Sequence, residues 1–222
     1  MGRSIFHEMS HAMKIRHATV ALASTLLACS LHAQEAKPVD TTPKLAYGLL
    51  LKQGEKIVFA PCRDRSYAIM EDVSKDQAVT AALNTVGLAA GKKLYVELLG
   101  IIENGMLKTS SLNMAQTEGR CQLPGTKEEA WRASGNEPGW VLAAGGELLT
   151  LKFPGKPTLN VPYTPFKREG KLALFNATSE SGPLAVRFEN TLCRDTMANA
   201  VFSWTASVTL NGQNYQGCAW ER

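Results

Sequence analysis

The second half of the chain carries the pattern that most limits its fold, because many short strand-like stretches there are separated by turn residues. Residues 203–210 (SWTASVTL) alternate in polarity, as a strand with one buried face does, and Asn211-Gly212 follows as a two-residue hairpin turn. We predict strands at 140–144, 147–153, 158–163, 171–176, 184–189, 201–210 and 214–220. Strands at such short spacing predict an antiparallel β-barrel or sandwich.

The first half of the chain combines strands with one helix. Ser74 and Gln77 fit a capping box, and apolar residues then recur at helical spacing as far as Gly87. The predicted strands lie at 45–51, 56–60, 66–70, 93–100 and 101–112, and the last segment is expected to fold back at the two-residue turn Asn104-Gly105. This order predicts a small five-stranded barrel of OB type. The fold class is therefore mainly β, with an OB-like domain at 44–122, a linker at 122–129 and a second β domain at 130–222.

Residues 1–33 are typical of an export signal. Lys14 and Arg16 precede an uncharged apolar run at 18–28, which is shorter than the roughly 20 residues that a membrane-spanning helix needs. Two processing routes stay open: cleavage after Ala33, or lipidation of Cys29 in the lipobox-like sequence LLAC at 26–29. Residues 34–43 read as a tether. Both routes predict a protein of the periplasm or outer membrane, with a lipid anchor if Cys29 is modified.

Cysteine usage supports export. Removal of Cys29 leaves an even set of four cysteines, which in an exported protein predicts two disulfides. Three pairings exist, and the composition change near 122–128 favours the two local ones, Cys62–Cys121 and Cys193–Cys218. One disulfide would then lie in each predicted domain.

Histidine usage excludes several kinds of chemistry. The four histidines all lie within or next to the signal, at positions 7, 11, 17 and 32. The remaining chain therefore cannot form Ser-His-Asp or Cys-His nucleophile systems, nor the usual His-containing zinc and copper sites. No Cys-x-x-Cys pair occurs, so we predict no metal and no cofactor. The net charge of +4 is not concentrated in one segment, which argues against a nucleic-acid partner.

Several separated motifs occur in order in the second domain. They are GNEP-x-W at 135–140, C-x-D-x-M at 193–197, Asn-Gly at 211–212 and Y-x-G-C at 215–218. Through them the second domain resembles a family of uncharacterised bacterial envelope proteins and lipoproteins. The first domain resembles, through its FAPC and YVELLG segments at 59–62 and 95–100, the OB-like C-terminal domain of the NlpE lipoproteins. These resemblances imply an envelope location and a binding or sensing role.

Candidate site residues lie in these motifs. We expect Pro138 to begin a strand whose edge N–H is not needed, and Trp140 to anchor that strand in the core. Asp195 is expected to cap its turn by accepting backbone hydrogen bonds. Glu137 has no evident structural role. The candidate contacts to a ligand or partner are Asn136, Glu137, Trp140, Asp195 and Trp220.

Three functions remain open. The leading hypothesis is a non-enzymatic envelope module that binds a ligand or partner protein in stress sensing or in inhibition of wall hydrolases. The first alternative is a carrier of small molecules or lipids, which would need a deep apolar cavity. The second alternative is a hydrolase that uses carboxylates alone, which would need two of them facing each other across a cleft.

Overall fold

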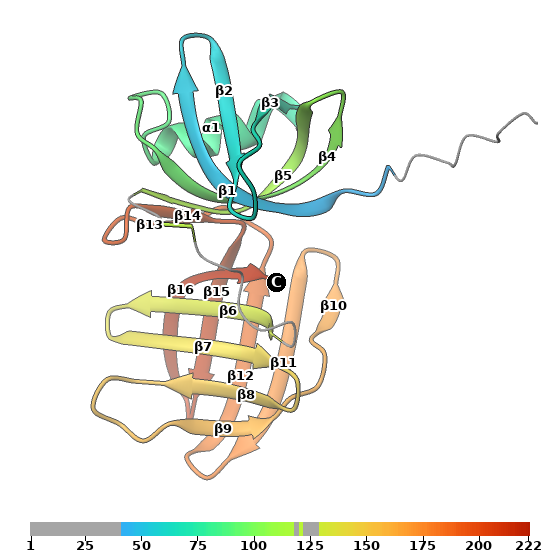
Figure 1. Ribbon diagram of the computed structural model, residues 1–222. Coiled ribbons are helices and arrows are strands. Elements are labelled where there is room, and N and C mark those ends of the chain that lie inside the picture. The colour runs from blue at the N-terminus through green and yellow to red at the C-terminus, as the bar shows by residue number, and fades with distance from the viewer. Residues whose placement is uncertain (1–40, 118–119, 122–128) are drawn as a thin grey trace, which may run out of the picture. The chain divides into compact units, whose positions relative to one another are not determined.

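The computed structural model describes residues 41–117, 120–121 and 129–222 (Figure 1). The predicted signal, Cys29, nearly all of the tether and most of the predicted linker lie outside these residues. Strands dominate the described part, which confirms the mainly β fold class. Neither helical segment in the described ranges combines the length and hydropathy of a membrane-spanning helix.

The first sheet closes into a five-stranded barrel (Figure 1). Its strands are β1 (Lys44–Gln53), β2 (Lys56–Pro61), β3 (Ala68–Asp72), β4 (Leu94–Glu103) and β5 (Met106–Thr117). Strand β1 pairs with β2 and β4, and β2 pairs with β3. Strand β5 closes the barrel, because it pairs in parallel with β3 and antiparallel with β4. The predicted small barrel is therefore confirmed.

The barrel core is mainly aliphatic and includes one face of the helix. Helix α1 (Ala78–Thr85) connects β3 to β4 and buries Val79, Ala82 and Leu83. The largest fully buried side chains of this core are Leu50, Phe59, Leu83, Leu88, Leu94, Leu98 and Leu107. Apolar burial of this kind is what holds a short helix of eight residues in place.

The start of the helix differs from the prediction. The capping box is wrong, because Gln77 takes a left-handed φ of 52° and a short 3₁₀ turn, η1 (Lys75–Gln77), precedes α1. The Asp72 carboxylate instead accepts hydrogen bonds from the backbone N of Ser74 at 2.9 Å and of Thr80 at 2.6 Å. The Ser74 hydroxyl also accepts from the backbone N of Val79 at 3.1 Å, so Asp72, the last residue of β3, and Ser74 cap the helix together.

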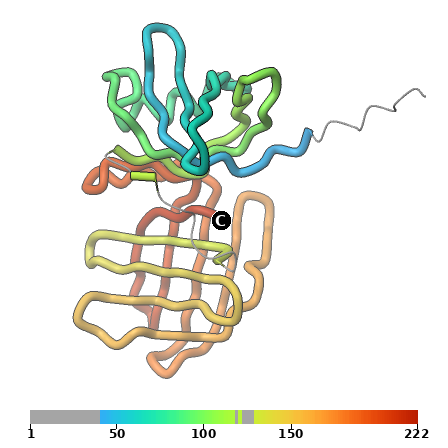
Figure 2. Tube along the Cα trace, in the orientation of Figure 1, coloured from blue at the N-terminus to red at the C-terminus, as the bar shows by residue number. Residues whose placement is uncertain are grey.

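The second sheet has nine antiparallel strands that curl around one core (Figure 2). Their spatial order is β10-β11-β12-β15-β16-β6-β7-β8-β9. The strands are β6 (Glu129–Asn136), β7 (Gly139–Gly145), β8 (Leu148–Lys152), β9 (Leu159–Pro162), β10 (Lys167–Glu169), β11 (Leu172–Ser179), β12 (Gly182–Glu189), β15 (Trp204–Leu210) and β16 (Gln213–Glu221).

Aromatic side chains fill the inside of this curl. The Trp131 ring lies 4.8 Å from Phe188, 5.1 Å from Trp204 and 5.5 Å from Phe166, measured between centroids. Trp131 is 2% exposed and Phe188 is fully buried. The interior of the sheet is thus a packed aromatic core.

The predicted strand at 201–210 is wrong as a single strand. It divides into β14 (Ala200–Phe202), which pairs with β5, and β15, which pairs with β12 and β16. The break falls at Ser203, whose backbone N donates to the Asn113 carbonyl on β5 at 3.0 Å. A further strand, β13 (Cys193–Asp195), pairs with β14. The C-x-D-x-M segment therefore belongs to a hairpin that extends the sheet of the first barrel.

Both favoured disulfides are present. Cys62–Cys121 and Cys193–Cys218 have Cα–Cα separations of 5.3 and 5.5 Å. The second disulfide joins β13 to β16 and so links the two sheets. Because structural disulfides persist in oxidising compartments, the pair indicates an extracytoplasmic location.

Candidate functional site

One concave surface brings together three of the five candidate residues. It has a volume of about 550 Å³ and is lined by residues 134–137, 193–197 and 216–218 together with Thr205. These residues come from the end of β6 and the turn after it, from β13 and the turn after it, and from β15 and β16. Asn136, Glu137 and Asp195 all lie on this surface, which we call the GNEP groove.

The turn between β6 and β7 brings Asn136 and Glu137 to the groove. Asn136 pairs with Gly139 across the turn, so Glu137 and Pro138 form the connection, with a cis peptide bond between them. The prediction that Pro138 begins the strand is therefore wrong, because both residues are used to reverse the chain and β7 begins at Gly139. The Glu137 side chain is exposed, and none of the described side chains pairs with its carboxylate.

The buried Trp140 ring packs against residues that line the groove. Its side chain is 2% exposed, and its indole Nε1 donates to the Gln216 carbonyl at 3.2 Å. The ring lies against two glycines, since a Cβ on Gly135 would come within 2.2 Å of Trp140 Nε1 and one on Gly217 within 2.8 Å of Trp140 Cζ2. Trp140 thus anchors the strand, as predicted, and does not line the groove.

Asp195 joins the two motifs of the groove. Its Oδ1 accepts hydrogen bonds from the Asn136 side-chain amide and from the backbone N of Met197 and Ala198, each at 2.9 Å. The two backbone bonds confirm the predicted turn cap. The bond from Asn136 also holds the β6–β7 turn against the β13–β14 turn, although these residues are 59 positions apart.

The groove also presents one exposed apolar side chain and two exposed charged side chains of opposite sign. Met197 is 73% exposed, and Glu137 and Arg194 are both exposed at the surface. Glu137 and Asp195 are the carboxylates of the groove, and the second already accepts three hydrogen bonds. Within the described ranges, no three His, Cys, Asp or Glu side chains gather as a metal-binding group.

Trp220 lies outside the GNEP groove. Its ring stacks on Phe202 with centroids 5.0 Å apart and an angle of 26° between the planes. It lines a separate hollow beside Arg132 and Lys152. The structure therefore does not gather Trp220 with the other candidate residues.

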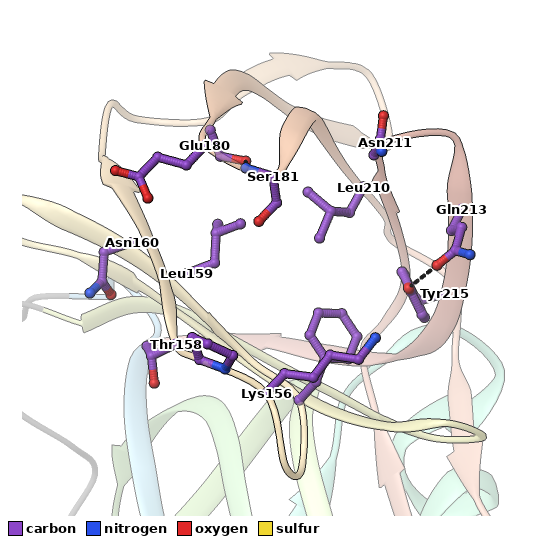
Figure 3. A pocket seen from close by; sticks show the side chains of 13 residues that line it. Lys156, Thr158, Leu159, Asn160, Glu180, Ser181, Leu210, Asn211, Gln213 and Tyr215 are labelled. Carbon is purple, nitrogen blue, oxygen red and sulfur yellow. Dashed lines mark hydrogen bonds between the residues drawn. The ribbon is translucent and has the colours of Figure 1, made fainter.

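A second concavity was missed at the level of sequence. It has a volume of about 610 Å³ and lies where the loop after β8 meets the β11–β12 and β15–β16 turns (Figure 3). We call it the mouth pocket. The turns were visible in the sequence as Ser-Gly and Asn-Gly pairs at 181–182 and 211–212. Their convergence was not visible, because it depends on the curl of the whole sheet.

The chain was compared with known proteins at three levels. No family model, no curated protein and no solved structure matched it.

Proposed function

We propose that the chain is an exported, non-enzymatic binding protein that docks a partner protein of the cell envelope in the GNEP groove. The single observation that carries the proposal is the gathering of two distant motifs, through Asn136 and Asp195, beside an exposed Met197. Methionine is common at adaptable protein-binding surfaces because its thioether chain is flexible and polarisable. The disulfide Cys193–Cys218 holds the strands that border the groove.

The chemistry of the groove favours binding over hydrolysis. A hydrolase that works with carboxylates alone needs one to act as an acid and another as a base or nucleophile. Asp195 is engaged in capping its turn, whereas Glu137 is exposed to solvent. The exposed charges of Glu137 and Arg194 fit the polar rim of a protein interface.

The packed interior argues against transport of a lipid. A carrier needs a cavity that encloses most of an acyl chain. In the curled sheet that space holds Trp131, Phe166, Phe188 and Trp204, each less than 9% exposed. A role in stress sensing or in inhibition of a wall hydrolase, both of which act through protein partners, fits the groove better.

A site-specific photo-crosslinker tests the proposal. Placed at Met197 in cells that export the full chain, it should give a discrete adduct with one envelope protein. The control position is Leu148, which is 48% exposed on β8 and lies outside the groove. Glu137→Lys should weaken the adduct, whereas Glu147→Lys, at an exposed residue of the β7–β8 turn outside the groove, should leave it unchanged. Equal adducts from both crosslinker positions, or none from Met197, would overturn the proposal.

Attachment to the envelope forms the second part of the proposal. We infer that the mature protein lies in the periplasm or at the outer membrane, and that Cys29 carries a lipid anchor if the lipobox is used. The mass of the mature N-terminal peptide decides between the two routes. A free N-terminus at Gln34 would exclude the anchor.

A further inference from the structure

The mouth pocket forms a second site, independent of the GNEP groove. The pocket combines an apolar floor with a polar rim (Figure 3). Its floor consists of Phe153, Leu159, Leu210 and Tyr215, and the Phe153 and Tyr215 rings contact each other at 4.8 Å between centroids. Its volume of about 610 Å³ falls within the range of about 300–1,000 Å³ that is usual for small-ligand sites.

The rim offers both donors and acceptors of hydrogen bonds. The carbonyl oxygen of one rim amide is already used, because Gln213 Oε1 accepts from the Tyr215 hydroxyl at 2.8 Å. The Gln213 NH₂ group therefore remains as a donor, whereas the Asn160 amide bonds to Thr150 Oγ1 on the outer face of the sheet. The Ser181 hydroxyl, which points toward the middle of the pocket in Figure 3, can donate or accept.

The charges of the pocket balance. Lys156 and Glu180 lie on opposite sides of it in Figure 3 and contribute one charge of each sign. The Lys156 ammonium lies 5.3 Å from the centre of the Phe153 ring, where the face of the ring attracts it. A site with a balanced lining has no preference for an anion or a cation.

From these features we infer that the mouth pocket binds a neutral, hydroxyl-rich ligand, namely a short segment of glycan. A sugar ring has an apolar C–H face that can lie on aromatic and leucine side chains, and hydroxyl groups around its edge that both donate and accept. The floor of the pocket offers apolar side chains and its rim offers hydrogen-bonding groups, which are the two kinds of group that a sugar ring needs.

Two other ligand classes fit the pocket less well. An acyl chain would have to enter the interior, where Phe175 and Trp131 already pack in the core. An extended peptide needs strand backbone to pair with. Strand β9 contributes only Leu159 and Asn160 to the wall, and most of the remaining wall consists of turns and a loop.

Titration of the purified full chain with maltotriose and tri-N-acetylchitotriose, followed by calorimetry and by amide NMR shifts, tests this inference. We expect saturable binding of at least one of them, with shifts at Leu159, Ser181 and Gln213. Gln213→Ala should weaken binding by about five- to tenfold, because it removes one hydrogen-bonding amide of the rim. Ser181→Trp, in an exposed turn, should block the pocket and abolish binding.

Asn214→Ala is the matched control. Asn214 is exposed like Gln213, and its amide oxygen also accepts a hydroxyl, that of Ser207, at 2.9 Å, but it does not line the pocket. The Asn214→Ala variant should bind both glycans with the same affinity as the unchanged protein. Three results would overturn the inference: no binding of either glycan, unchanged binding by Gln213→Ala and Ser181→Trp, or binding of laurate or triglycine at these residues in place of glycans. The crosslink at Met197 is unaffected by any of them, so this proposal and the proposed function fail separately.

Discussion

The five-stranded barrel and the nine-stranded sheet fill their interiors with different side chains. The barrel core is built mainly from leucines such as Leu50, Leu94 and Leu98, whereas the sheet encloses Trp131, Trp204 and several phenylalanines. The enclosed space widens as strands are added, so the larger curl needs larger side chains. The mouth pocket opens where turns of the larger sheet meet, whereas the GNEP groove also takes residues of β13, which belongs to the first sheet. The wider curl thus leaves a concavity at the ends of its own strands, whereas the groove depends on both sheets.

Truncation of one central side chain in each core tests this comparison most severely. Trp131→Ala should lower the free energy of unfolding by about 3–5 kcal/mol, and Leu98→Ala by about 2–5 kcal/mol. Trp131 should give the larger loss because it contacts three other rings. Urea denaturation of the full chain measures both. A clearly greater loss for Leu98→Ala would show that the aromatic core is not the more sensitive one.

Removing each disulfide in turn tests whether the GNEP groove depends on its own disulfide or on the overall stability of the fold. Loop-closure entropy predicts losses of about 4 kcal/mol for the double change Cys62→Ala and Cys121→Ala, and about 3.5 kcal/mol for Cys193→Ala with Cys218→Ala. The two losses are similar, but the second pair alone borders the GNEP groove. The Met197 crosslink should therefore weaken only in the second variant. If it weakens equally in both, the groove depends on overall stability and not on its own disulfide.

A methyl group added at Gly217, in the GNEP groove, should have a smaller effect on the free energy of unfolding. A Cβ on Gly217 would lie 2.0 Å from the Ser134 carbonyl oxygen, so Gly217→Ala should cost about 1–3 kcal/mol by forcing β16 away from β6. The control is Gly139→Ala, whose nearest neighbour would be Pro154 at 3.6 Å, an ordinary contact. Thermal unfolding of both variants checks the difference. An equal loss at the two positions would mean that close approach of the strands is not required.

The smallest predicted effect on stability concerns Asp72, in the five-stranded barrel. Partial burial tends to raise the pKa of Asp72, but hydrogen bonds from Ser74 and Thr80 outweigh it and lower this pKa from its ordinary value. The carboxylate therefore stabilises the fold above the unfolded pKa of about 3.9, and this contribution is lost as the pH falls through the folded pKa. Asp72→Asn should flatten the acid side of the stability curve, as measured by unfolding between neutral and acid pH. Parallel curves for the two proteins would contradict the assigned cap.

Local patterns predicted most of the elements because they need only neighbouring residues. The two-residue turns at Asn104-Gly105 and Asn211-Gly212 form with positive φ at all four positions, as their sequence required. The strand at 201–210 shows the limit of this reasoning. Both of its halves have β pattern, but β14 and β15 pair in different sheets, and local periodicity contains no information about the partner strand.

The candidate site was predictable only in part. Asn136, Glu137 and Asp195 stood out as polar residues without a core role, but their common position follows from the pairing of β6 with β16 and of β13 with β14. Trp220 could not be separated from them, because its stacking on Phe202 depends on a contact between distant strands. No local sequence pattern predicts the mouth pocket, since its lining comes from a loop, two turns and the ends of strands that are distant in the sequence.

The sequence by itself determined the β class, most of the strands and turns and the favoured disulfide pairs, and it contains no histidine after residue 32. These follow from side-chain chemistry and short-range periodicity, which act within a few residues. The tertiary structure alone decided that the C-x-D-x-M hairpin extends the first sheet, that Asn136 meets Asp195, and that a pocket opens at the end of the curled sheet. Each of these depends on which distant strands pair and on how far the sheet curls, and those are set by packing of the whole core.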